Sequence, residues 1–287
     1  MAKLYEHRFW HSADGLKLHY RDYAGPDGTD KPPVICLHGL TRNARDFAPV
    51  AAQIAQSRRV IVPEMRGRGR SEYAKDTATY SPLTYIADVK ALLAEQGIDR
   101  VVSIGTSMGG LMTMMMAGED AGLFAGVVIN DIGPAIDPEG LSRIAGYVGQ
   151  GGSYASWMHA ARALRSTHAS AFPDYGLDQW LEMAKRTLIV GQNGRISYDY
   201  DMGIAEPFKQ PGNAAPPDLW GAFEALKDTP MVLIRGGLSD LLSEETAREM
   251  QARAADLTLA TVPRVGHAPM LDEPESLAAI THLLERV

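Results

Sequence analysis

A serine between glycines is the first feature of this sequence that can carry chemistry. Residues Gly105-Thr106-Ser107-Met108-Gly109 fit the pattern G-x-S-x-G, in which the serine occupies a sharp strand-to-helix turn and acts as a nucleophile. The pattern alone is weak, because glycine and serine are common residues. The context strengthens it, since Val101–Ile104 is typical of a buried strand and Met108–Ala117 of a helix. Ser107 is therefore the candidate nucleophile.

A nucleophilic serine needs a general base within hydrogen-bond reach. His267 lies in the stretch Val265-Gly266-His267-Ala268-Pro269, between the last predicted strand and the last predicted helix. A loop histidine between small neighbours has room to approach a hydroxyl. We take His267 as the candidate base.

Two aspartates compete to orient that histidine. Asp240 follows the predicted strand Met231–Ile234, and Asp131 follows the predicted strand Gly126–Ile129. We prefer Asp240, because the chain order Ser107, Asp240, His267 is the one that a G-x-S-x-G enzyme of this kind uses. Asp131 remains the alternative acid, although an aspartate in that position can also serve only to cap a turn.

Backbone N–H groups are expected to complete the site. His38-Gly39-Leu40 follows the predicted strand Val34–Leu37. The N–H of Leu40 and that of Met108, directly after the nucleophile, are the predicted donors of an oxyanion hole. His38 is then expected to brace the loop with its ring.

The elements that must position these residues alternate between apolar runs and amphipathic stretches, the pattern of a parallel sheet covered by helices. Asp14-Gly15 predicts a hairpin between two strands at the start of the chain. The predicted strands are Glu6–Ser12, Leu16–Tyr23, Val34–Leu37, Arg59–Val62, Val101–Ile104, Gly126–Ile129, Met231–Ile234 and Leu257–Val262. The predicted helices are Phe47–Gln56, Pro82–Glu95, Met108–Ala117, Glu244–Ala254 and Glu273–Arg286.

The alternation stops between Pro134 and Asp228, where helical patterns such as Ser156–Thr167 and Leu177–Ile189 replace strand-like runs. This predicts an α/β core formed by residues 1–133 and 229–287, with a mostly helical cap, 134–228, inserted over its binding face.

Composition excludes several classes of function. The 287 residues carry 28 Lys and Arg against 35 Asp and Glu, a net charge of −7 without a basic tract, so nucleic acid is not an expected partner. The chain contains one cysteine, no apolar leader and no run suited to a membrane span. We expect a cytoplasmic monomer or small homo-oligomer that binds a small-molecule substrate and no membrane. No metal-ligand spacing or dinucleotide fingerprint appears, so neither a metal nor a cofactor is expected.

Together these motifs resemble those of the α/β-hydrolase superfamily over essentially the whole chain. The matching segments are His38-Gly39, Arg66 to Ser71, Gly105–Gly110, Gly237–Asp240 and Gly266-His267. The resemblance implies a mainly parallel eight-stranded sheet with helices on both faces and a helical cap inserted after the sixth strand. Family members usually carry Asp two residues before the Arg-Gly stretch, where this chain has Glu64, and we expect that difference to affect a structural turn alone.

The resemblance also narrows the reaction. Epoxide hydrolases and haloalkane dehalogenases of this fold attack with Asp, where this chain has Ser107. C–C bond hydrolases typically carry Asn before the serine, where this chain has Thr106. The favoured function is cleavage of a small ester, lactone or amide through a Ser-His-Asp triad and an acyl-enzyme. A C–C hydrolase of ring-cleavage diketones and a ligand-binding protein without activity remain the alternatives.

A helical cap favours a small, enclosed substrate. Arginine and aromatic side chains within it are candidates for substrate binding, because a guanidinium can bind a carboxylate in a bidentate manner. The candidates are Arg162, Arg186, Trp157 and Tyr200, although most cap arginines are expected on solvated helix faces.

Overall fold

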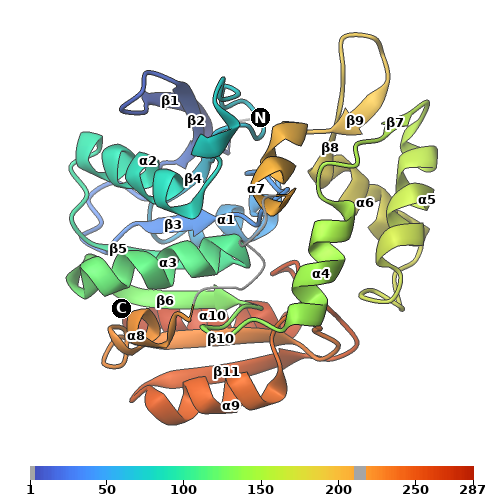
Figure 1. Ribbon diagram of the computed structural model, residues 1–287. Helices are drawn as coiled ribbons and strands as arrows, with labels where there is room; N and C mark the ends of the chain where they lie inside the picture. The colour runs from blue at the N-terminus through green and yellow to red at the C-terminus, as the bar shows by residue number, and fades with distance from the viewer. Residues whose placement is uncertain (1–3, 210–217) are drawn as a thin grey trace.

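The core of the protein is a sheet whose strands run mostly in one direction (Figure 1). A computed structural model describes residues 4–209 and 218–287. The sheet has the strand order β1-β2-β4-β3-β5-β6-β10-β11. Only β2 runs antiparallel to its neighbours β1 and β4, and all the other pairs are parallel. Its strands are Glu6–His11 (β1), Lys17–Tyr23 (β2), Val34–Leu37 (β3), Val60–Glu64 (β4), Val101–Thr106 (β5), Phe124–Asn130 (β6), Met231–Gly236 (β10) and Leu257–Val262 (β11).

The helices cover both faces of this sheet, and a large apolar cluster lies against each face. On one face α2, α3, α8 and α9 contribute to the first cluster, and on the other α1 and α10 contribute to the second. The bounds of these helices are Ala48–Ile54 (α1), Pro82–Glu95 (α2), Met108–Glu119 (α3), Trp220–Glu224 (α8), Glu244–Arg253 (α9) and Pro274–Arg286 (α10). The predicted eight-stranded α/β-hydrolase architecture is therefore confirmed, with element ends shifted by a few residues.

Most of the segment between β6 and β10, residues 138–198, lies beside the sheet, on the right in Figure 1. The described residues between β6 and α8 form the helices Pro138–Tyr147 (α4), Trp157–His168 (α5), Leu177–Thr187 (α6) and Glu206–Lys209 (α7). They also form a three-stranded antiparallel sheet of Ser153–Tyr154 (β7), Leu188–Val190 (β8) and Ile196–Tyr198 (β9). This small sheet was not predicted, because strands of two or three residues leave no usable alternation in a sequence.

The end of the predicted cap belongs with the core. Helix α8 packs against α3, where a Cβ on Gly118 would lie 3.4 Å from Ala222, and Phe223 is fully buried in the core cluster. The predicted range 134–228 therefore contains both the cap elements and one helix of the sheet layer. No helix within residues 4–209 and 218–287 is long and apolar enough to cross a membrane.

The start of α3 lies unusually close to the sheet. A Cβ on Gly109 would lie 2.0 Å from the carbonyl oxygen of Leu37 on β3, and one on Gly105 would lie 2.5 Å from Gly109. Side chains are therefore excluded at both glycines, and this contact fixes where α3 begins.

We expect Gly109→Ala to lower the free energy of unfolding by about 2–3 kcal/mol, because the new methyl group must displace backbone. Gly221→Ala in α8 is the matched control, since nothing lies within 4 Å of its Cβ. It should stabilise slightly, by about 0.5–1 kcal/mol, because alanine favours helix over glycine. Urea unfolding of the two variants checks this, and equal effects would contradict the proposed close contact.

Candidate active site

Ser107 occupies the turn between β5 and α3 in a backbone conformation that side chains rarely adopt. Its φ is +51° and its ψ −114°. Strain of this kind is found where surrounding structure holds a residue for function. Here the glycines on either side allow the close strand-to-helix passage, and the serine hydroxyl is left at the end of the strand.

His267 connects the serine to a buried carboxylate. Its Nε2 lies 2.9 Å from Ser107 Oγ, and its Nδ1 lies 2.9 Å from Asp131 Oδ2. The side chain of Asp131 is fully buried, and its Oδ1 accepts the Gly236 N–H at 2.8 Å. Its Oδ2 also accepts the Ser239 hydroxyl at 2.7 Å. Both carboxylate oxygens are therefore held in place, as an orienting acid requires.

The preference for Asp240 as the partner of His267 is wrong in this structure. Asp240 forms a two-pronged ion pair with Arg143 of α4, through Nε and Nη2. Burial opposes its ionisation, but the Arg143 guanidinium outweighs burial and lowers the pKa of Asp240. Asp240 does not reach His267 because it points outward to Arg143 of the cap. The preceding residue, Ser239, points inward and donates to Asp131.

The loop after β3 holds Leu40, one of the two predicted oxyanion donors. His38 is buried, its Nε2 accepts the Met65 N–H at 3.1 Å, and its Nδ1 donates to the carbonyl of Gly39 at 2.8 Å. Burial lowers the pKa of His38 to about 4, so the ring braces the loop in its neutral form, as expected. Among the described residues, the N–H groups of Leu40 and Met108 have no protein acceptor, which leaves both available to a ligand.

The Arg-Gly stretch, Arg66 to Ser71, stabilises the loop after β3. Arg68 donates from Nε to the Leu40 carbonyl at 3.0 Å and is fully buried. Glu64, which stands where relatives usually have Asp, accepts the N–H groups of Ala44 and Arg70 and a ring N–H of His19. Burial opposes its charge, but these hydrogen bonds outweigh it and lower the pKa of Glu64 to about 2. Its role is structural.

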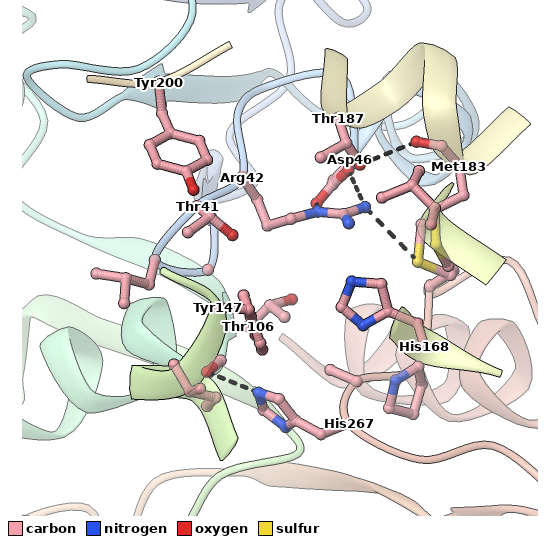
Figure 2. A pocket seen from close by; sticks show the side chains of 18 of the residues that line it. Thr41, Arg42, Asp46, Thr106, Tyr147, His168, Met183, Thr187, Tyr200 and His267 are labelled. Atoms are coloured by element: carbon pink, nitrogen blue, oxygen red, sulfur yellow. Dashed lines mark hydrogen bonds and ion pairs between the residues drawn. The ribbon is translucent and has the colours of Figure 1, made fainter. Parts of the chain in front are cut away.

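A cavity of about 110 Å³ opens onto Ser107 and His267 beneath the cap (Figure 2). Of the predicted substrate-binding residues, only Tyr200 lines it. Arg162 is exposed on α5, Arg186 pairs with Asp272, and Trp157 packs against the second apolar cluster. These three expectations are wrong, because residue type alone does not say which face of a helix meets the cavity.

Several polar side chains that line the cavity were not predicted from the sequence. Thr41 and Arg42 directly follow the oxyanion loop, and that position was a signal that could have identified them. Tyr147 and His168 end two cap helices and offered no such signal. Among the described residues, no three His, Cys, Asp or Glu side chains form a group suited to a metal ion.

Comparison with known proteins identifies the family. A model of the family described as "Alpha/beta hydrolase family" matches residues 34–280. The chain belongs to this family. It is an enzyme, a hydrolase, because it is similar to a 3-hydroxybutyrate-oligomer hydrolase over 90% of that protein's length and to an esterase over 82% of its length.

Three relatives illustrate the similarity. A 3-hydroxybutyrate-oligomer hydrolase of Cupriavidus necator is 34% identical, with 91% of this chain and 90% of the relative covered. A 2-(acetamidomethylene)succinate hydrolase of Mesorhizobium japonicum is 23% identical, with 88% of each chain covered. A crystal structure of an alpha/beta hydrolase from Novosphingobium aromaticivorans is 53% identical, covers both chains completely and superposes with a TM-score of 0.96.

The His168 ring gives a pH-dependent prediction. Burial, aided by the charges of Arg42 and Arg143, lowers the pKa of His168 to about 4 from 6.5. Because the unfolded chain binds this proton more readily, stability should fall as the pH drops from about 6.5 toward 4. Between pH 7 and pH 5 we expect a loss of about 1–2 kcal/mol from this group.

Urea unfolding of wild type and His168→Gln at both pH values tests this expectation. The variant should lose less stability than the wild type. A ring signal of His168 that titrates near 6.5 in NMR spectra would show that burial of the imidazole has no effect.

Proposed function

We propose that this hydrolase cleaves a small carboxylic ester through Ser107, His267 and Asp131. The observation that carries the proposal is the continuous chain of hydrogen bonds from Asp131 through His267 to Ser107, ending at the cavity. Such an arrangement suits acyl transfer, because the base lies 2.9 Å from the nucleophile on one side and 2.9 Å from the orienting acid on the other.

The steps follow from the positions of the groups. Ser107 Oγ attacks the ester carbonyl while His267 Nε2 takes its proton, and Asp131 holds the imidazole and stabilises its positive charge. The N–H groups of Leu40 and Met108 bind the oxyanion that forms. His267 then protonates the leaving alcohol, and a water molecule that His267 activates releases the acyl group from Ser107.

The cavity suits a short acyl or alcohol group. Apolar side chains from the cap line much of it: Ile144, Val148, Leu164, Phe172 and Met183. The similarity to a 3-hydroxybutyrate-oligomer hydrolase makes short esters of small hydroxy acids the first substrates to test. Lactones and small amides come next, since the same acyl-transfer chemistry applies to them.

We expect wild type to hydrolyse p-nitrophenyl butyrate and Ser107→Ala to lose at least about 10³-fold in kcat/KM, because the variant lacks the nucleophile. Release of p-nitrophenol measures this, with short 3-hydroxybutyrate oligomers tested by chromatography. Equal turnover by both proteins would refute Ser107 as nucleophile. Binding of these esters without turnover by either protein would favour a ligand-binding role.

Paired aspartate variants test the orienting acid. Asp131→Asn should lower kcat by about 10³- to 10⁴-fold, because the amide no longer supports the required imidazole tautomer or its charge. Asp240→Asn should retain activity within about fivefold, since its partner is Arg143. Loss of activity in Asp240→Asn with retention in Asp131→Asn would assign the role to Asp240 instead.

A further inference from the structure

Arg42 enters the cavity from the loop after β3, two residues beyond Leu40, whose N–H is one of the predicted oxyanion donors. Its Cγ lies 3.4 Å from the point that a Cβ on Gly39 would occupy, and Ser107 Cβ lies 3.8 Å from that point. The stem of the arginine and the nucleophile are therefore neighbours across Gly39. Figure 2 shows its guanidinium reaching into the space that His168 also faces.

One edge of the guanidinium is occupied and the other is open. Asp46 accepts from Nε at 2.5 Å and from Nη2 at 2.7 Å, and Nη2 also lies 3.9 Å from the Met270 sulfur. Among the described residues, Nη1 has no acceptor. Burial opposes the charge, but the Asp46 carboxylate outweighs it and raises the pKa of Arg42. The end formed by Nη1 and Nη2 thus offers charged donors to the cavity.

His168 faces the cavity from the end of α5. Its ring stacks edge-on against Tyr147, with centroids 5.4 Å apart. Within residues 4–209 and 218–287, neither ring nitrogen forms a hydrogen bond to a protein group. A neutral imidazole carries one N–H donor, so His168 can add a donor beside Arg42.

The carboxylate that lines the cavity is already paired. Asp46 is the only carboxylate among the described lining residues, and both its oxygens bind Arg42. The nearby cap guanidinium of Arg143 pairs with Asp240 and does not line the cavity. An anionic group that enters therefore meets open donors and no unpaired negative charge.

We propose that Arg42 and His168 bind a free carboxylate of the substrate while Ser107 attacks its ester carbonyl. An arginine can hold two carboxylates at different edges, because its five N–H donors form a planar fork. The substrate class is then a short ester that carries a second, ionised carboxyl group. This inference rests on the proposed ester hydrolysis, and it deepens that function by naming the residues that select the substrate.

The alternative is that Arg42 only ties its loop to Asp46. The two interpretations differ in what they predict for charged and neutral substrates. A structural arginine affects both alike, whereas a carboxylate-binding arginine affects the charged substrate alone.

The test compares p-nitrophenyl hydrogen glutarate with its methyl ester, which has the same acyl chain without the charge. Rates are corrected for hydrolysis without enzyme. Wild type should prefer the acid in kcat/KM. Arg42→Gln should lower kcat/KM for the acid by about 10- to 100-fold, the effect of one charged hydrogen bond, and change the methyl ester less than about threefold. Arg162→Gln, an exposed cap arginine, is the control and should change neither.

Two further sets of variants separate recognition from folding. Arg42→Gln combined with Asp46→Asn removes the pair without leaving a partly buried carboxylate unpaired, and it should show the same selective loss. His168→Phe should weaken turnover of the acid more than His168→Gln, which keeps a donor. Equal losses for acid and methyl ester in these variants, or no preference for the acid in wild type, would overturn the proposal.

Binding gives a measurement that does not depend on turnover. Glutarate should bind to Ser107→Ala in calorimetry, and adding Arg42→Gln should weaken that binding by about tenfold or more. If Ser107 proves unnecessary for hydrolysis while this difference persists, the ester mechanism fails and the carboxylate site stands. Glutarate binding that is unchanged by Arg42→Gln would overturn the site whatever the mechanism.

Discussion

The close contact between the start of α3 and the neighbouring strands is the constraint on which the rest of the site depends. With glycine at 105 and 109, the helix can begin directly against β3 and β5, and the chain must pass through Ser107 with a positive φ. That turn presents the hydroxyl at the carboxyl edge of the sheet. The same edge carries the loops after β3, β6, β10 and β11. The close packing of α3 against β3 therefore places Ser107 beside the loops that carry His267 and Asp131.

Asp131 and Asp240 show how neighbouring strands can offer the same residue type to one site. Strands β6 and β10 are paired in parallel, with Asn130 opposite Ile234, so both aspartates follow at the same edge. The sequence predicts that the two aspartates lie near each other, but it does not determine which carboxylate points toward His267. The decision depends on Ser239, whose hydroxyl donates to Asp131, and on Arg143, which engages Asp240 from the cap. Both contacts join segments about 100 residues apart in the chain.

The parts that the sequence predicts well are those set by local pattern. Strands such as Leu257–Val262 and helices such as Pro82–Glu95 match their predicted bounds, because long apolar periodicity and a Ser-Pro helix start are local signals. The cap is predicted only from the loss of strand-like runs between residues 134 and 228, which says little about its internal structure. The strands of its small sheet are too short to be recognised in the sequence. Arg42 and His168 line the same cavity only because α5 packs over the loop after β3. Such contacts depend on tertiary packing, which no local pattern encodes.

Ion pairs and hydrogen bonds join the cap to the core around the cavity. Arg143 to Asp240, Arg45 to Asp199, Arg186 to Asp272 and Arg264 to Asp174 all cross from one to the other. The pair of Arg264 with Asp174 is exposed, and an exposed pair contributes about 0–1 kcal/mol. The Asp199 carboxylate that binds Arg45 is buried. The Gly266 N–H donates to the Ala171 carbonyl at 2.6 Å, which joins the loop of His267 directly to the cap. A movement of the cap would therefore shift the loop that carries His267. The position of the cap and the geometry of the triad are coupled through this hydrogen bond.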